Sequence, residues 1–147
     1  LCTAPANDLA HWKTTFSPLK YDSSLMFTHD DEIYLIARRN IAGTFDRAPN
    51  WLGKHARQVF NLLFYSFTRK RTALYHVDRD TATIKPLFDF QSCGDTAFAG
   101  IAPLKEPNHF YVLNYSSPID GTDWPWIFGQ LMPTHIYGTT IKFEKQE

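Results

Sequence analysis

Two aspartates stand at matching places in the sequence, each just before an apolar segment. Asp22 precedes the run at 25–29, and Asp95 precedes the run that begins at Thr96. Carboxylates that open two neighbouring strands can converge on one pocket, where one donates a proton and the other removes a proton or attacks carbon. Hydrolysis of a glycosidic bond uses such a pair. The alternative role is local, because Asp also caps turns and accepts hydrogen bonds from nearby backbone.

One arginine and three tryptophans can supply the contacts that hold a ligand. Arg38 ends a predicted strand, and its planar guanidinium can pair with a ligand carboxylate through two parallel hydrogen bonds. An ion pair within the protein is the other role open to it. Indole rings stack on the apolar faces of sugars, and they also anchor long loops. The candidates for such stacking are Trp51, Trp124 and Trp126.

Composition and motifs exclude several other classes of protein. Fifteen Lys and Arg balance fifteen Asp and Glu, so no overall field draws the chain to nucleic acid or to an acidic membrane. No apolar stretch approaches the ~20 residues of a membrane span. Motifs of nucleotide cradles, zinc peptidases and nucleophile-elbow hydrolases are missing, and the six histidines are scattered. The sequence therefore predicts no cofactor, no metal site, no nucleic-acid partner and no membrane span.

The elements that position these residues are predicted to be β-strands. Aromatic residues make up 16% of the chain, and large rings favour strands. Apolar alternation between turn signals predicts seven strands after a short N-terminal hairpin. These strands lie at 25–29, 32–39, 71–76, 83–90, 96–104, 109–115 and 135–143. Tyr34, Tyr111 and Tyr115 fall on strand faces and are predicted to belong to the core.

The strands form one meander of four and a second of three. Repeated antiparallel meanders predict an all-β fold, a β-propeller with four-stranded blades. We expect residues 1–17 to end one blade, 18–91 to form a whole blade and 92–147 to form the last. Because so few blades cannot close a ring, the chain is predicted to be the C-terminal part of a five- or six-bladed propeller. Its remaining blades would come from a missing part of the chain or from a partner chain.

Two long insertions interrupt the meanders, at 40–68 and 116–134. Both lie between the second and third strands of a blade, on the face of a propeller where ligands bind. The first contains a predicted helix at 54–67. Its Val59, Leu63 and Phe67 share one side at a spacing of four residues, which predicts packing against the blade.

Three segments resemble the C-terminal blade of sialidase-like propellers. Residues 94–101 read Gly-Asp-Thr-Ala-Phe-Ala-Gly-Ile, close to the Gly-Asp-Thr-x-Tyr-Pro-Gly of that family's inner strand. An aromatic strand ending in Tyr-Ser, at 110–117, and a closing Ile-Tyr strand, at 136–141, follow in the same order. The turn at 3–12 also resembles a degenerate Asp-box, the hairpin that recurs in such propellers.

The resemblance implies hydrolysis of a terminal sugar outside the cytoplasm, in a secreted or periplasmic protein. In that family arginines hold a carboxylate, an acidic residue donates a proton, and a tyrosine activated by a carboxylate attacks. Here the position of that tyrosine falls at or beside Phe98, which has no oxygen. Two alternatives stay open: a glycosidase that uses the paired carboxylates Asp22 and Asp95, or a propeller that binds a glycan or a protein without reacting.

Overall fold

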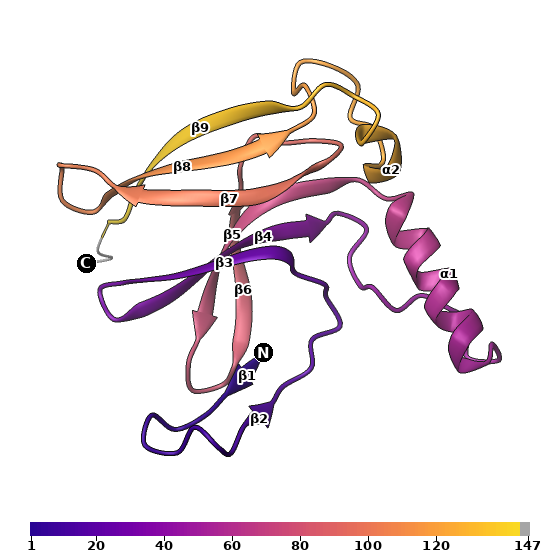
Figure 1. The fold of residues 1–147 in the computed structure, drawn as a ribbon, viewed down its shortest axis with the longest axis horizontal. Coiled ribbons are helices and arrows are strands. Elements are labelled where there is room, and N and C mark those ends of the chain that lie inside the picture. The colour runs from indigo at the N-terminus through magenta and orange to yellow at the C-terminus, as the bar shows by residue number, and fades with distance from the viewer. Residues whose placement is uncertain (145–147) are drawn as a thin grey trace.

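Three antiparallel β-sheets form the body of the computed structural model, which describes residues 1–144 (Figure 1). Strands that follow one another in sequence are neighbours in each sheet. The first sheet contains β1 (Cys2–Thr3) and β2 (Lys13–Thr14). The second contains β3 (Asp22–His29), β4 (Glu32–Asn40), β5 (Lys70–Asp78) and β6 (Thr83–Asp89). The third contains β7 (Thr96–Pro103), β8 (His109–Ser116) and β9 (His135–Lys142).

The predicted all-β class and both meanders are confirmed. Each of the seven predicted strands corresponds to one of β3 to β9, and six of them agree within two residues at either end. The exception is β3, which begins at Asp22 rather than Leu25. A bulge explains the difference: Ser23 has a φ of 51°, and the extra residue between Asp22 and Leu25 breaks the alternation. The last residues of the predicted final blade, 145–147, lie outside the described residues.

The first strand of the third sheet has a matching bulge. Between Ala97 and Gly100 strand β7 carries one residue more than its partner β8, and Phe98 has a φ of 43°. A bulge bends a strand and turns its side chains in a new direction. The second and third sheets therefore share the same irregularity, near the start of the strand that opens each of them.

Two apolar clusters cover the two faces of the middle sheet. One consists of Leu35, Ala37, Ala73, Tyr75 and Val77, and Leu1 of the N-terminal hairpin packs against it. The other joins Ile36, Leu74 and Phe90 to Val112 and Ile141 of the third sheet. The central strands β4 and β5 are thus buried on both faces. As a result the three sheets pack on one another in the order in which the chain forms them.

The first insertion contains helix α1 (Lys54–Ser66), as predicted, but the predicted packing of its apolar side is wrong. Val59, Leu63 and Phe67 are 56%, 56% and 53% exposed. The helix instead buries Asn61 and Tyr65. Asn61 satisfies two backbone donors of the preceding loop, because its Oδ1 accepts hydrogen bonds from the N–H groups of Arg47 and Ala48, each at 2.9 Å. In Figure 1 the helix projects away from the sheets.

The second insertion contains a single short helical turn, α2 (Trp126–Gly129). Neither of the two described helices is long and apolar enough to cross a membrane.

A buried lysine holds the end of α1 against the sheet. The Nζ of Lys70, the first residue of β5, donates to the backbone oxygens of Tyr65 at 2.5 Å and Thr68 at 3.1 Å. It also lies 3.7 Å from the centre of the Tyr65 ring. Burial and, to a smaller extent, the positive charge of Arg38 lower the pKa of Lys70 to about 7. The charged ammonium that donates to these carbonyls has therefore lost most of its contact with water, which lowers its stability relative to the neutral amine.

We expect Lys70 to make the stability of the protein depend on pH. Its pKa is lower in the folded protein than the ordinary 10.5, so the unfolded chain binds more protons between about pH 7 and 10.5. The free energy of unfolding should therefore increase as the pH rises through this range. Urea unfolding at pH 7.0 and pH 8.5 measures the increase. A Lys70→Met variant should show a smaller one, and an equal increase in both proteins would contradict the prediction.

Candidate functional site

Four of the six residues predicted for the site lie at one end of the second and third sheets. Asp22 opens β3 and is the register partner of Arg38 near the end of β4. Asp95 immediately precedes β7, and Trp126 lies in α2, which follows β8. Antiparallel pairing places the start of one strand beside the end of the next, so all four residues lie at the same end of the two sheets. This is the end where both helices lie in Figure 1.

Asp95 is the centre of this group, which we call the Asp95 cluster: Asp95, Arg38, Tyr115 and Trp126. The Oδ1 of Asp95 accepts the indole N–H of Trp126 at 2.7 Å, the hydroxyl of Tyr115 at 3.1 Å and Nη2 of Arg38 at 3.5 Å. Its Oδ2 has no hydrogen-bond partner within residues 1–144 and is not among their buried unsatisfied atoms. One oxygen is thus held by the protein, and the other is free to meet a ligand.

Arg38 connects the second sheet to the third. Its Nε donates to the backbone oxygen of Thr96 at 2.7 Å, and its Nη2 lies 3.4 Å from the hydroxyl of Tyr115. The guanidinium carbon lies 5.1 Å from the centre of the Trp126 ring. The side chain is almost fully buried. Arg38 therefore has an internal ion-pair partner in Asp95, and it also brings a positive charge to the edge of the cluster.

Tyr115 was predicted to belong to the core, and the structure places it in the cluster instead. It is half-buried at the end of β8, opposite Ala97 in the register, with its hydroxyl on Asp95. Burial raises the pKa of the Tyr115 phenol, Asp95 raises it further, and Arg38 opposes both. The phenol is therefore protonated at neutral pH and donates to the carboxylate. The signal in the sequence was the Tyr-Ser that ends an aromatic strand.

The second predicted carboxylate belongs to a separate network. The Oδ2 of Asp22 accepts the hydroxyl of Tyr65 at 2.6 Å and lies 3.1 Å from Nζ of Lys20. Burial and Asp22 raise the pKa of the Tyr65 phenol, whereas the nearby Arg38 lowers it. Tyr65 thus links the two networks, since it bonds to Asp22 and lies near Arg38. Sequence reasoning had not picked out Tyr65, which reaches Asp22 from 43 residues away.

The two other predicted tryptophans lie outside the cluster. Trp51 is 82% exposed in the loop before α1, and Trp124 packs edge-on against Phe128 with ring centres 6.3 Å apart. Phe98, in contrast, adjoins the cluster: its ring stacks on that of Tyr115 at 5.9 Å and is 69% exposed. The bulge in β7 turns this aromatic face toward solvent. Phe98 is thus an exposed ring in direct contact with the Asp95 cluster.

Two glycines and a serine fix the position of the backbone at Asp95. Gly94 has a φ of 56°, and the Ser117 hydroxyl accepts the backbone N–H of Asp95 at 3.1 Å. The same hydroxyl donates to the backbone oxygen of Gly129 at 3.1 Å. Gly129 lies so close that a Cβ added to it would come within 2.6 Å of the carbonyl carbon of Gly94. The contact requires glycine at 129, and it sets the distance between α2 and the start of β7.

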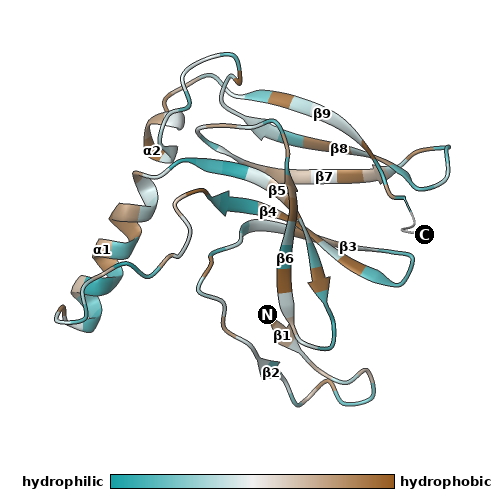
Figure 2. Ribbon diagram, turned by 180° about the vertical axis from the view of Figure 1, so that it is seen from behind, coloured by the Kyte–Doolittle hydropathy of each residue, from teal (hydrophilic) through white to brown (hydrophobic). Residues whose placement is uncertain are grey.

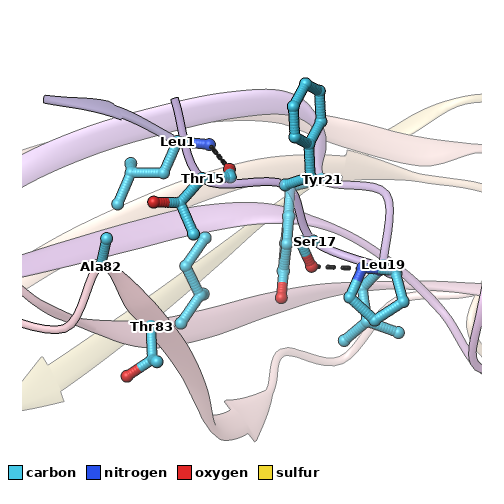
Figure 3. Close-up of a pocket in the computed structure, with 10 residues that line it drawn as sticks. Leu1, Thr15, Ser17, Leu19, Tyr21, Ala82 and Thr83 are labelled. Atoms are coloured by element: carbon cyan, nitrogen blue, oxygen red, sulfur yellow. Dashed lines mark hydrogen bonds between the residues drawn. The ribbon is translucent and has the colours of Figure 1, made fainter. Parts of the chain in front are cut away.

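An open cavity lies elsewhere in the molecule. Figure 3 shows it between the N-terminal hairpin, the segment leading into β3 and the start of β6, with Leu1, Thr15, Tyr21 and Thr83 among its walls. Its volume is about 300 Å³, and none of the predicted site residues lines it. The Asp95 cluster thus sits apart from this cavity, at the helix-bearing end of the sheets.

No family model, curated protein or solved structure that was compared with the chain matches it. What can be said about its function therefore depends on the geometry of the Asp95 cluster.

We expect Gly129→Ala to disturb the cluster more than an alanine in open space. The added methyl group must separate α2 from Gly94 and Asp95, and such overpacking costs typically about 1–3 kcal/mol. Gly100→Ala is the matched control, because nothing lies within 4 Å of a Cβ at that position of β7. Thermal unfolding followed by circular dichroism measures both variants. Equal stability of the two would contradict the proposed close contact.

Proposed function

We propose that the chain is part of a carbohydrate-active β-propeller, and that the Asp95 cluster binds and cleaves a terminal sugar. The observation that carries the proposal is the hydrogen bond from the Tyr115 hydroxyl to Asp95, beside the buried charge of Arg38. A tyrosine paired with a carboxylate is an alternative to the two-carboxylate arrangement of most glycosidases. In this proposal Tyr115, paired with Asp95, takes the role of the tyrosine for which the resemblance predicted a position at or beside Phe98.

The packing of the sheets supports the propeller assignment. Two successive meanders pack face to face, and the strand that opens each carries a bulge near its start. Both long insertions leave the same end, where the Asp95 cluster lies (Figure 1). Propellers place ligand sites at such an end of their opening strands. On this interpretation the second and third sheets are adjacent blades, and the first sheet is the remnant of a third.

Three residues of the cluster, Tyr115, Asp95 and Arg38, have roles in the proposed reaction. The oxygen of Tyr115 attacks the anomeric carbon as the glycosidic C–O bond breaks, and its proton passes to Asp95. The leaving oxygen takes a proton from a water molecule, and the hydroxide that this forms then attacks the anomeric carbon. The bond to Tyr115 breaks, and Asp95 returns the proton to the phenol. Arg38 stabilises the negative charge that develops on the tyrosine oxygen during the first step.

The same charges indicate which sugars would bind best. The guanidinium of Arg38 lies 3.5 Å from Oδ1 of Asp95, and Oδ2 of Asp95 has no partner within residues 1–144, so a sugar with its own carboxylate and a hydroxyl donor would find both a cation and an acceptor. Phe98 offers an exposed ring on which the apolar face of a pyranose can stack. We therefore propose an anionic sugar, bound between Phe98 and the Asp95 cluster.

Binding without reaction is the second candidate function. It is favoured by the hydrogen bonds already formed within the cluster: Nε and Nη2 of Arg38 and Oδ1 of Asp95 have partners within the protein. Side chains held in this way can act as a rigid platform. In that case Phe98 and Trp126 would make the main contacts with the glycan.

We expect Tyr115→Phe to lower the rate of hydrolysis by at least about 100-fold with little change in sugar affinity, since it removes only the attacking oxygen. Tyr111→Phe is the matched control, because Tyr111 is an exposed tyrosine on the same strand. Release of 4-methylumbelliferone from neutral and anionic glycosides measures the rate. Titration calorimetry with the free sugars measures the affinity.

The outcomes separate the two candidates. Affinity for a sugar without turnover in the unaltered protein would favour the binding function. Turnover that is equal in the Tyr115→Phe and Tyr111→Phe variants would contradict the role of Tyr115. Neither affinity nor turnover with any of these sugars would overturn both candidates.

A further inference from the structure

Helix α1 has its polar side on the protein and its apolar side in solvent. Arg57, Asn61 and Tyr65, at a spacing of four residues, bond to Asp46 at 2.7 and 2.8 Å and to Asp22 at 2.6 Å. On the opposite side Val59, Phe60, Leu63 and Phe67 form what we call the apolar stripe, and each is at least 40% exposed. A helix at the surface of a protein in water has the reverse arrangement. Figure 2 shows hydrophobic residues along this projecting helix.

The apolar stripe continues onto the second insertion. The ring of Phe67 packs against that of Phe128 at 5.9 Å, and Phe128 in turn contacts Trp124. Leu131, just beyond α2, is 81% exposed. Two segments far apart in sequence thus contribute to one apolar surface, which is larger than the scattered exposed side chains that are normal in soluble proteins.

Basic residues flank the stripe in sequence, although the net charge of the whole chain is zero. Between residues 47 and 77 the sequence has six Lys and Arg and no Asp or Glu. Arg57 and Arg71 pair with Asp46 and Asp123 from outside this stretch. Lys54 and Arg69 are exposed, and neither makes a salt bridge within residues 1–144. The balance of charges predicted from composition therefore conceals a local excess of positive charge at α1.

We propose that α1 is a peripheral membrane anchor that lies in the surface of a bilayer rich in anionic lipid. A helix with an apolar side of Phe and Leu and with basic residues beside it binds at the boundary between head groups and acyl chains. Lys54 and Arg69 would contact lipid phosphates. Trp51, almost fully exposed just before the helix, is of the residue type that gathers at this boundary. The proposal does not depend on the proposed sugar chemistry.

Charge complementarity favours a lipid surface over a second copy of the chain. Packing the stripe of one molecule on that of another would bring the two sets of cations together, and the 47–77 stretch contains no acidic residue to separate them. The stripe also stands on a helix that projects from the sheets (Figure 1). A bilayer can accommodate such a convex apolar ridge, and its phosphates supply the missing negative charge.

Sedimentation of the 147-residue chain with vesicles tests the proposal. We expect at least tenfold stronger binding to vesicles of phosphatidylcholine with 30% phosphatidylglycerol than to phosphatidylcholine alone, and weaker binding as salt increases. A Val59→Ser, Leu63→Ser, Phe67→Ser triple variant should lose binding at least tenfold. Because these side chains are already exposed, the variant should keep the circular dichroism spectrum and unfolding temperature of the parent.

Two further variants serve as controls. Leu113→Ser combined with Ile136→Ser removes exposed apolar side chains of the third sheet and should leave vesicle binding unchanged. Lys54→Gln combined with Arg69→Gln should remove most of the preference for anionic vesicles. Absence of vesicle binding, equal binding to neutral and anionic vesicles, or equal binding by the triple variant would overturn the proposal. Dimers that light scattering detects in the parent and not in the triple variant would assign the stripe to a second copy instead.

Discussion

The buried guanidinium of Arg38 is the interaction on which the rest of the arrangement depends. It joins the end of β4 to the start of β7 through its bond to the Thr96 oxygen, and so fixes the second sheet against the third. Burying a charge is costly unless ion pairing and hydrogen bonds compensate. Asp95, Thr96, Tyr115 and the Trp126 ring provide that compensation. The groups that a ligand would meet are therefore the same groups that make the contact between sheets possible.

The bulge in β7 explains why an aromatic ring is exposed beside this contact. In a regular β7 the side chains would alternate between the two faces of the sheet, and Phe98 would follow that alternation. Its φ of 43° instead turns the ring away from the sheet packing and over Tyr115. A bulky residue in this conformation costs on the order of 1–3 kcal/mol, so it persists only because the surroundings enforce it. Such strain is typical of functional positions, and here it lies next to the tyrosine and carboxylate.

Local pattern was sufficient to predict the strands, the meanders and helix α1. It also selected Asp22, Arg38, Asp95 and Trp126, because each stands at the end of a predicted element or in a long loop. The role of Tyr115 could not be read in this way. Its partners Asp95 and Arg38 lie 20 and 77 residues away in sequence, and they meet only after two sheets have packed. Strand periodicity assigns a tyrosine to a face but says nothing of which carboxylate will face it.

The wrong prediction for α1 has the same origin. Spacing identified the side of the helix that carries Val59, Leu63 and Phe67, and the rule that apolar sides face inward placed it on the sheet. The rule fails here because the loop at 46–48 and Asp22 offer hydrogen-bonding groups that only a polar side can satisfy. Tyr65 takes part both in the orientation of α1 and in the candidate site, since it lies on the helix and bonds to Asp22 beside Arg38. The outward direction of the apolar stripe and the geometry of the candidate site are therefore consequences of one set of polar contacts.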